Sequence, residues 1–545
     1  MIKNLYNLTV NEIIKILKRK SMIIISIIIF IIAFVFPFII NSINNESINW
    51  GFGIEVEEIN ATINNTSTKT IGGKIKKEFL EASKSKFELL TKYKIPATDW
   101  RYQEANNYYN SILKEDALKY LKQGVNPEVI LGLLPNNPDV NIQEIKEALE
   151  ISKGNINNEI LKATKETENI KEIISKNDYL NYLNLKIKSE KNTIAKINKN
   201  LDVLNNQYEK NKNNNAIKNN IDSLNIALKK AENSLKISQY RLDNKVTFST
   251  KDWRNNTLNS IINSENVLLE KKLTQEEYAT NQMKNISYSK YEKIFNNSKT
   301  KAENNIKESW YSLNHNIPNP KDTNSSRNYL NNTIPIIVVL TTLLAAIIAG
   351  SIVSKEFITG SIRLLLIRPV SRVKILISKL LGSIIISYII LFIGSIFGII
   401  GSGIAGSFSD YTNNVVMMSS DKIIIHNYFI TMISHLLFLS LSLLFIICIA
   451  FLLSTITRST AVSVAVSIIL FIGSFIIVLI LFSHNYYFIG NILLPYINLT
   501  MLPMLNQSSP QAMLNNFVGG IELTVSSIIF IIISIFVFKT RDITN

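Results

Sequence analysis

The stretch from Ser354 to Leu380 decides the fold, and it reads SKEFITGSIRLLLIRPVSRVKILISKL. It is rich in basic side chains and separates two long apolar runs. An apolar run of about 20 residues is long enough to cross the hydrocarbon core of a bilayer as a helix. The stretch is therefore expected to be a short loop between two membrane spans, exposed at one surface of the membrane.

Working outward from this loop, the chain contains six apolar runs long enough to span a bilayer. They are 22–40, 333–353, 380–403, 426–456, 460–482 and 518–538. Only 18% of the 545 residues are charged, and no Asp, Glu, Lys or Arg occurs from 459 to 521. Soluble domains carry roughly 25% charged residues, so an evenly soluble enzyme is excluded. Charges come every few residues from Ala61 to Glu308, which indicates one large aqueous domain.

Two apolar regions need a separate interpretation. The stretch 483–520 contains Pro495, Pro503 and Pro510, and because proline interrupts helices we expect short interfacial or re-entrant pieces there. The first run lacks a small-x-small cleavage pattern after it, so we expect an uncleaved anchor and not a signal peptide.

The distribution of basic residues predicts the orientation. Outside residues 42–332 the chain has 15 Lys or Arg, and 14 of them lie on one predicted side, with Lys422 as the exception. Basic residues favour the cytoplasmic side, so both termini are expected there, in a multi-pass bacterial plasma membrane protein with residues 42–332 outside. The surplus of Lys and Arg is nine in the membrane part and seven in the outer part. No basic patch on a recognised fold accompanies it, so nucleic acid is not an expected partner, and anionic lipid head groups are.

The outer region, 42–332, is expected to be helical, with an antiparallel coiled-coil hairpin at about 178–242. Apolar residues recur every seven positions from Leu180 to Tyr208, with Glu190 as a break in the second apolar position. A polar turn at 210–215 follows, and the pattern resumes from Ile217. Two seams of similar length joined by a short loop indicate an antiparallel pair. The hairpin is interpreted as a structural spacer or as a docking arm for an extracellular ligand or protein.

The loop itself closely resembles the signature of ABC-2 type transporter permeases. The resemblance rests on Glu-Phe-x-x-Gly-Ser-Ile-Arg-x-Leu-Leu, from Glu356 to Leu365, then Arg-Pro-Val-Ser-Arg, from Arg368 to Arg372. It extends to an amphipathic N-terminal segment with Asn11-Glu12 ahead of Lys18-Arg19-Lys20. Together these segments cover residues 1–41 and 333–545, and the long insertion between the first two spans departs from the smaller family members.

The resemblance implies a fold and a set of site residues. The fold is an all-α membrane protein with six spans and both termini cytoplasmic. Its parts would be an elbow helix at 1–21, the first span at 22–41, the outer domain at 42–332, the second span at 333–353, a coupling loop at 354–374, and spans three to six with a short tail at 375–545. The loop residues that would contact an ATPase subunit are Glu356, Phe357, Gly360, Arg363, Arg368, Pro369 and Arg372.

Nucleotide chemistry is expected on another chain. No Gly-x-x-x-x-Gly-Lys-Ser/Thr sequence occurs, so this chain has no Walker A loop to hold ATP. The protein is therefore not expected to be an enzyme or to bind a cofactor itself; ATP and Mg²⁺ would sit on a separate ABC ATPase subunit. A single cysteine, Cys448, and four scattered histidines predict no metal site. The permease would pair with itself or with a paralogue.

A few polar or small residues inside the spans are candidates for further roles. Gly394 and Gly398 form a Gly-x-x-x-Gly pair, which suits packing within the chain or a dimer seam. Glu522, His426 and His435 are candidates for the transport pathway, because ionisable groups in spans are functional candidates by default.

Two main function classes remain open from the sequence, and a third option is a phage or adhesion receptor with degenerate transport spans. The first is the permease of an exporter that moves an amphipathic, lipid-like, peptide or drug cargo. The second is an ATPase-driven sensor or mechanical transmitter that acts through the outer hairpin without cargo. The sequence does not name the cargo or the partner of the hairpin tip.

Overall fold

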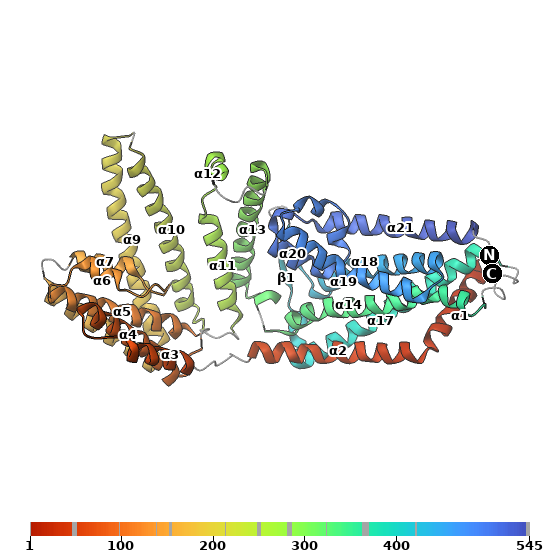
Figure 1. Ribbon diagram of the computed structural model, residues 1–545, viewed down its shortest axis with the longest axis horizontal. Helices are drawn as coiled ribbons and strands as arrows, with labels where there is room; N and C mark the ends of the chain where they lie inside the picture. Colours follow the sequence, from red (N-terminus) through yellow and green to blue (C-terminus); the bar gives the residue numbers. More distant parts are fainter. Residues whose placement is uncertain are drawn as a thin grey trace. The chain divides into compact units, whose positions relative to one another are not determined.

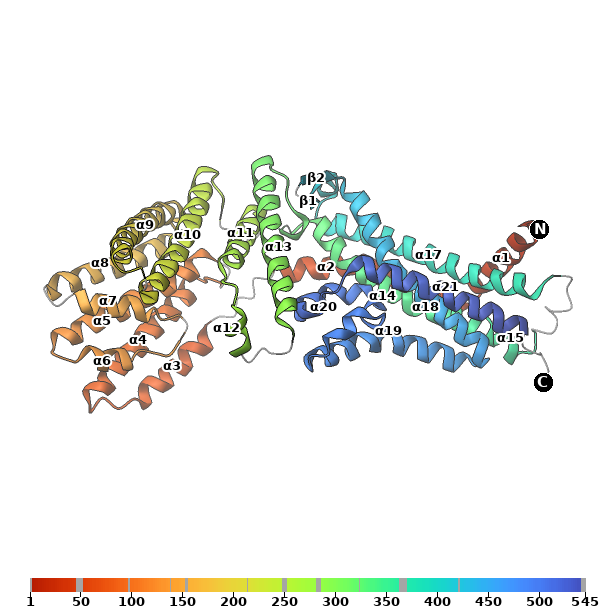
Figure 2. The ribbon, with the colours of Figure 1, turned by 90° about the horizontal axis from the view of Figure 1, so that it is seen from above.

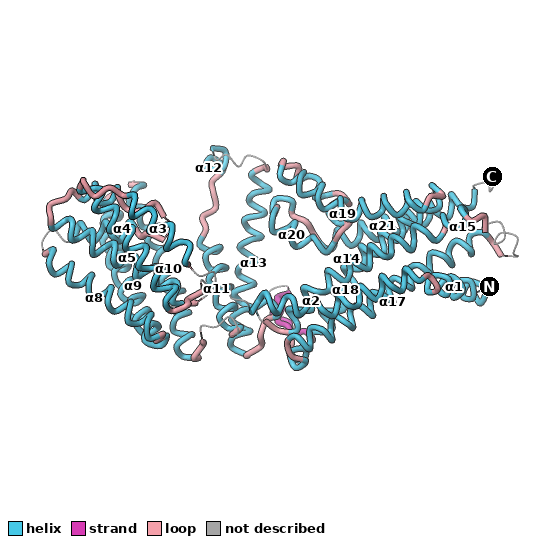
Figure 3. Tube along the Cα trace, turned by 60° about the horizontal axis from the view of Figure 1, so that its bottom comes forward, coloured by secondary structure: helices cyan, strands magenta, loops and turns pink. Residues whose placement is uncertain are grey.

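A computed structural model describes residues 2–45, 52–96, 99–137, 139–151, 155–212, 214–247, 252–280, 286–322, 324–361, 370–419 and 422–540. The chain divides into two compact units. Unit 1 comprises residues 1–42 and 263–545, and unit 2 comprises residues 43–262. Helices dominate both units, as Figure 3 shows, and the strands are confined to one two-stranded hairpin among the described residues.

Unit 1 contains six helical segments that are long and apolar enough to cross a membrane. The spans and the helices next to them are α1 (Ile2–Leu17), α2 (Lys20–Asn45), α14 (Ser326–Ile352), α15 (Ser354–Ile358), α17 (Arg372–Ala405), α18 (Tyr428–Thr457), α19 (Thr460–Ser483) and α21 (Asn516–Thr540). All of them except α15 are labelled in Figure 1, and α15 is labelled in Figure 2. All six predicted spans are confirmed as helices long and apolar enough to cross a membrane, with ends that differ from the prediction by up to eight residues. The second span continues through the break at Val353 into α15, so it ends inside the predicted loop.

The core of unit 1 is built around α14. This helix packs against α17, α18 and α19, and most of its apolar residues from Leu330 to Ile352 are buried. Hydroxyl side chains are buried with them and donate to carbonyls one turn back: Thr342 donates to Val338 O and Ser387 to Ser383 O. Most of these small polar residues therefore fit into an apolar interior with their donors satisfied. The exception in α14 is Thr341, whose buried hydroxyl has no partner in the described part of the chain. By contrast, α2, α19 and α21 expose most of their apolar residues, as lipid-facing helices do.

The Pro-rich stretch between α19 and α21 folds as short turns. They are η4 (Tyr487–Asn491), η5 (Leu494–Tyr496), η6 (Leu499–Met501), α20 (Leu502–Ser508) and η7 (Pro510–Ala512). Pro495, Pro503 and Pro510 each fall in the first turn of one of these pieces, where the missing amide donor costs nothing. The prediction of short pieces in place of a seventh span is confirmed for the described residues.

A β-hairpin lies between α17 and α18, and the sequence interpretation missed it. Strand β1 (Val415–Ser419) pairs antiparallel with β2 (Lys422–His426), with Val415 opposite His426. The predicted all-α fold class is confirmed, with this hairpin as the exception among the described residues. The fourth span begins at Tyr428 and not at His426. The apolar run KIIIH looks like the start of a span because β-branched residues suit both structures. Figure 2 shows the hairpin beside α13 (Tyr288–His315), which contacts β1.

The division between the two compact units falls inside the predicted outer region, whose bounds at 42–332 stay a prediction. Residues 263–332 belong to unit 1, although the sequence placed all of 42–332 in one domain. They include the end of α11 (Trp253–Leu269), α12 (Gln275–Thr280), α13 and η2 (Pro320–Asp322). Lys299 of α13 donates to the carbonyls of Val267, Leu268 and Glu270 at 2.8, 2.6 and 2.7 Å, and so caps the end of α11. Contacts of this kind join segments distant in sequence, so the apolar pattern alone could not place the boundary.

Unit 2 is a set of amphipathic helices. They are α3 (Gly53–Asn65), α4 (Ile71–Lys92), α5 (Trp100–Lys122), α6 (Pro127–Gly132), α7 (Ile142–Ile151), α8 (Ile156–Lys176), α9 (Tyr179–Lys210) and α10 (Asn215–Asp243). Two apolar clusters hold them: one around Phe79, Tyr109 and Leu113, and one around Leu90 and Ile174. Trp100, Tyr108 and Tyr109 are core residues.

Helices α9 and α10 form a long helical hairpin where the sequence predicts one. They pack along each other and are joined by residues 211–214. The break at Glu190 is satisfied across the hairpin, since its Oε1 accepts from the hydroxyls of Ser234 and Ser238. Coiled-coil packing along the rest of the seam stays a prediction.

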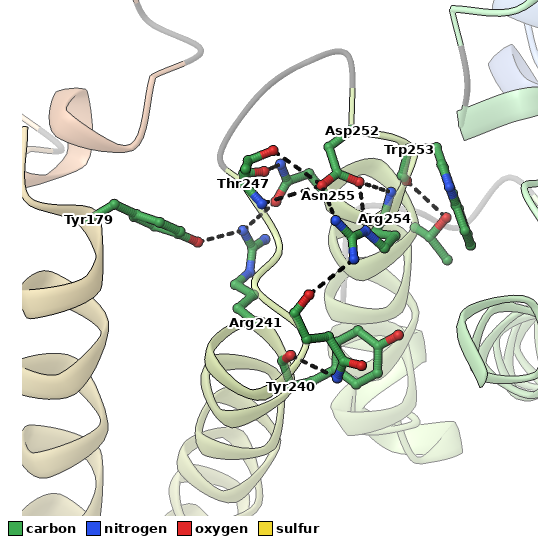
Figure 4. Close-up of polar contacts among 10 residues, drawn as sticks. Tyr179, Tyr240, Arg241, Thr247, Asp252, Trp253, Arg254 and Asn255 are labelled. Carbon is green, nitrogen blue, oxygen red and sulfur yellow. Dashed lines mark hydrogen bonds and ion pairs between the residues drawn. The ribbon is translucent and has the colours of Figure 1, made fainter. Parts of the chain in front are cut away.

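The base of this hairpin is fixed by a polar cluster (Figure 4). Arg241 is buried at the end of α10 and donates to Oδ1 of Asn255 at 2.6 Å and to the hydroxyl of Tyr179 at 3.4 Å. Arg254 pairs with Asp252 at 2.7 Å, two residues before it. The cluster ties the ends of α9 and α10 to the start of α11 within unit 2.

Candidate functional site

The candidate site is a cluster of charged side chains at the end of unit 1 where α1, α15 and α17 meet. Lys379 of α17 is fully buried, and its Nζ is paired with two carboxylates. It lies 2.5 Å from Oε1 of Glu356 and 3.1 Å from Oε2 of Glu12. The two carboxylates come from α15 and α1, which are far apart in sequence. A buried ammonium group needs such partners, because an unpaired charge in an apolar interior costs several kcal/mol. Lys379 therefore holds the three helices together.

Two further cations complete this charged cluster, one from α1 and one from the turn between α1 and α2. Lys15 lies 2.8 Å from Oε1 of Glu12 and 3.5 Å from Oε1 of Glu356. Arg19 donates to the hydroxyl of Ser351 at 2.8 Å, near the end of α14. We call Glu12, Lys15, Glu356 and Lys379 the charge network. Its members carry two positive and two negative charges, so it is neutral overall.

The protonation behaviour of Glu12 follows from its surroundings. Burial raises the pKa of its carboxyl, but Lys379 and Lys15 more than offset this, so the pKa lies below its ordinary value. For Lys15, burial lowers the pKa, but Glu12 and then Glu356 raise it above its usual range. Both groups are therefore charged at neutral pH, and the network is an ionic one.

The elbow helix α1 lies close against α17 because Gly382 leaves room for it. A Cβ built on Gly382 would be 3.2 Å from Cβ of Glu12, tighter than almost all real contacts of that kind. Thr9, Glu12 and Ile16 form the buried stripe of α1, while Ile14 and Leu17 are exposed. Asn11 is exposed on the opposite side of the helix. The stripe that meets the protein is thus partly polar, which the amphipathic pattern did not reveal.

Short helix α15 contacts the ends of the other spans. Ser354 of this helix makes polar contacts with two other spans. Its amide donates to Oγ of Ser454 at 2.9 Å, and its hydroxyl lies 2.9 Å from Oγ1 of Thr460. The ring of Phe357 lies between the guanidinium of Arg458, 4.7 Å from its centroid, and the ring of Phe538, 6.5 Å away. Helix α15 is therefore bonded to α18, α19 and α21 as well as to α1 and α17.

The loop beyond α15 begins with a turn that needs glycine. Gly360 has φ of +68°, which L side chains rarely adopt, and its Cβ position is open space. The predicted residues Arg363, Arg368 and Pro369 lie outside the described residues. Arg372 begins α17 and is exposed. Of the predicted loop residues, the structure brings Glu356 and Phe357 into the protein interior and leaves Gly360 and Arg372 at the surface.

Glu356 occupies a different environment from a free surface carboxylate. Only 14% of its side chain is exposed, its Oε1 faces Lys379 and Lys15, and its Oε2 is buried with no hydrogen bond in the described part of the chain. Its pairing with Lys379, which Glu12 shares, could not be predicted from the sequence, because ion pairs between distant segments have no spacing pattern. The one available signal was the lysine itself, a charge at the start of a long apolar run.

The candidate residues within the spans do not form one site. Gly394 and Gly398 face Ile337 of α14 in the same chain, so both take part in packing within the chain, and the dimer seam stays a prediction. Glu522 lies on α21, His435 on the exposed side of α18, and His426 at the end of β2. No hydrogen bond or ion pair joins these three among the described residues, and no group of metal ligands occurs there.

A second polar cluster, which the sequence interpretation missed, lies at the other end of α14. Arg327 is 1% exposed and donates to the carbonyls of Pro318, Asn413 and Asn414 at 2.9, 3.3 and 3.1 Å. Its backbone carbonyl accepts from the hydroxyl of Tyr428 at 3.1 Å. Glu308 of α13 accepts from the amide of Met418 at 2.6 Å. These bonds connect α13, the β-hairpin, α14 and α18 in one chain of contacts.

Comparisons with known proteins agree with this arrangement. A family model described as "ABC-2 family transporter protein" matches residues 160–543. Among curated proteins, the chain is similar to the uncharacterised protein YhcI of Bacillus subtilis (strain 168), with 31% identity over 249 residues, which cover 43% of this chain and 74% of YhcI. No solved structure matches.

Proposed function

The chain belongs to the ABC-2 family of transporter membrane proteins, and from this premise we propose that it is the permease subunit of an ATP-driven exporter. The ATPase is a separate polypeptide, because this chain has no Walker A sequence. Loop 354–374 and elbow helix α1 form the surface that receives the ATPase, on the cytoplasmic side of the plasma membrane. The dimer partner is a second copy or a paralogue.

The observation that carries this proposal is the charge network. An ATPase that pushes on loop 354–374 moves α15, which begins the loop. Because Glu356 is bonded to Lys379, and Lys379 to Glu12, the movement reaches α17 and α1 together. Phe357 passes it to α21 and to the α18–α19 turn. A push at one short helix therefore becomes a joint displacement of the spans, which is what alternating access requires.

An amphipathic or lipid-like cargo suits the surface of the spans best. A hollow of about 480 Å³ opens between α18 and α21. Phe438, Leu441, Phe517, Ile521 and Val525 line it, with Asn516 and Thr524 as its polar members. Apolar lining with a few polar groups is the usual character of a site for an apolar ligand with a polar end. Glu522 follows Ile521, which lines this hollow, and one of its carboxylate oxygens is buried without a partner in the described part of the chain.

The test of this proposal is co-purification. The tagged chain is extracted from membranes in detergent and the captured proteins are identified, for the parent and for a variant with Arg363→Glu and Arg368→Glu. We expect an ATP-hydrolysing subunit with the parent and its loss with the variant. Capture of no nucleotide-binding protein in several detergents would overturn the assignment.

A second function has its own supporting observation. The contacts from Glu308 to the β-hairpin and from the hairpin to Arg327 run from α13 into the spans. Movement of the spans would thus reach α13, as an ATPase-driven mechanical transmitter without cargo requires. ATP hydrolysis stimulated by a lipid-like cargo supports the exporter, whereas hydrolysis that no cargo changes supports the transmitter.

A further inference from the structure

Unit 2 contains an open groove that none of the functions above uses. It has a volume of about 1160 Å³ and lies between α5, the start of α7, α8 and α9. Amides, hydroxyls and carboxylates dominate its lining, among them Glu104, Asn106, Asn107, Asn110, Asn169 and Thr193. Its apolar members are few: Val140, Ile170, Ile173 and Leu185. A groove with this lining is suited to a ligand that makes many hydrogen bonds.

The side-chain oxygen of Asn106, at the floor of the groove, receives no hydrogen bond in the described part of the chain. Asn106 is 7% exposed, and its Nδ2 donates to Oδ1 of Asp139 at 3.5 Å, which leaves Oδ1 as the free acceptor. That oxygen is buried and has no partner in the described part of the chain. A buried acceptor without a donor costs about as much as a lost hydrogen bond, so such atoms are rare in proteins. Asn106, which lines the groove, therefore carries an acceptor that a ligand donor would satisfy.

Beside it, Glu104 is also buried, with 8% exposed. Asn107 donates to its Oε1 at 2.7 Å, and burial raises the pKa of the carboxyl despite that bond and the charge of Lys186. The other carboxylates of the groove have lysine partners. Lys114 lies 3.1 Å from Glu144 and 2.5 Å from Glu166, and Lys86 lies 2.9 Å from Asp139. The groove thus has little net charge to attract an ionic ligand.

Three macromolecular ligands can be compared on these grounds. Nucleic acids need an excess of Lys and Arg, which paired carboxylates do not provide. Extended peptides bind by adding to a sheet edge or by placing apolar anchors in pockets, and this groove is made of helices with few apolar side chains. Sugar hydroxyls both donate and accept, as the side-chain amides do. The mixed amide and carboxyl lining therefore matches a sugar best.

We propose that this groove binds a neutral oligosaccharide. The hydroxyls of the sugar donate to Oδ1 of Asn106 and to the carboxyl of Glu104, and accept from the neighbouring amides. Tyr182, which lines the groove and stacks on Trp100 at 4.7 Å between centroids, supplies a rigid ring beside the sugar. The volume exceeds the range of about 300–1,000 Å³ of small-molecule sites, so the ligand has more than one ring. This assignment does not depend on the proposed transport function.

The test uses the full chain in lipid nanodiscs and calorimetric titration with chitotriose, cellotriose and maltotriose, with triglycine amide as the peptide probe. Thr193→Trp fills the groove from an exposed position on α9, so it blocks the site without touching the floor. Asn205→Trp, exposed on the same helix and not part of the lining, is the matched control. Asn106→Leu removes the free acceptor.

At least one trisaccharide is expected to bind the parent with a Kd below about 1 mM. Thr193→Trp abolishes the binding, Asn205→Trp leaves it unchanged, and Asn106→Leu weakens it about tenfold or more. The proposal is overturned if no trisaccharide binds, if Thr193→Trp binds as the parent does, or if triglycine amide binds instead. If Asn106→Leu does not fold, the Thr193 and Asn205 pair still decides the matter.

Discussion

The ammonium group of Lys379 lies 2.5 Å from Oε1 of Glu356, and its side chain is fully buried. Glu356 is on α15 and Lys379 near the start of α17, so their pair closes the two ends of the intervening loop. Glu12 of α1 is the third member, 3.1 Å from the same ammonium group. The two helices that flank the loop proposed to receive the ATPase, α15 and α17, are thus joined through one buried cation, Lys379.

Replacing Lys379 with Met is expected to destabilise the protein. The substitution leaves two carboxylates without their shared cation, and breaking a buried ion pair in this way costs about 3–5 kcal/mol. Equilibrium unfolding in detergent micelles measures the loss. Lys539→Met, at an exposed position on α21, serves as the control and changes stability by less than about 0.5 kcal/mol. Equal stability of the two variants would show that the network contributes little.

The stability of unit 1 is expected to fall in acid through Glu12. Its carboxyl has a pKa lowered from 4.5 in the folded protein, so its contribution is fully present above pH 4.5. The contribution is lost as the pH falls through the folded value, because protonation removes the attraction to Lys379 and Lys15. Unfolding midpoints of the parent and of Glu12→Gln are compared from about pH 7 down to about pH 2.5, so that the range reaches below the unfolded value of 4.5. The difference between them shrinks on acidification; a difference that stays constant contradicts the pairing.

Gly382→Val is expected to separate α1 from α17. The added Cβ alone approaches Cβ of Glu12 to 3.2 Å, and the methyl groups of Val need still more room. Overpacking of this kind costs about 1–3 kcal/mol. A cysteine placed at Thr9, which is buried against α17, becomes open to maleimide in this variant. Gly473→Val is the control, since its Cβ would meet only Ile469 at 3.8 Å among the described atoms. If the Thr9 cysteine stays protected in the Gly382→Val variant, α1 is not held as described.

Arg327→Leu is expected to loosen the β-hairpin. The substitution removes the donors to the carbonyls of Asn413 and Asn414, while the methylene packing is kept. Proteolytic cleavage within residues 413–426 should rise about tenfold or more, because charged hydrogen bonds hold this segment closed. Arg101→Leu, which loses a pair with Asp99 two residues away in unit 2, leaves that cleavage rate unchanged. Equal cleavage rates in the two variants would show that Arg327 does not hold this segment, and so does not connect it to the spans.

The spans and the loop could be predicted from the sequence because both depend on local properties. Hydropathy over about 20 residues marks a span, and the 63 uncharged residues from 459 to 521 leave little choice. The family motif likewise marked Glu356 and Glu12 as important. Their chemistry was not predictable, because the bond to Lys379 joins residues 23 and 367 positions apart, which no periodicity encodes.

The β-hairpin and the division between units were missed for the same physical reason. Strand β2 is a short β-branched run directly before a span, so the sequence favours an extended span. Residues 263–332 have the same polar helical character as residues before them, and only contacts such as Glu308 with Met418 assign them to unit 1.

The most direct measurement is capture of the ATPase by network variants of the tagged chain. The parent and Lys422→Glu, a charge reversal at an exposed position on β2, are expected to retain a nucleotide-binding subunit from detergent extracts. Gly382→Val and Lys379→Met are expected to lose it while still eluting as folded protein in size exclusion. Retention of the subunit by both network variants would contradict the claim that Lys379, Glu356 and Glu12 position the loop that receives it.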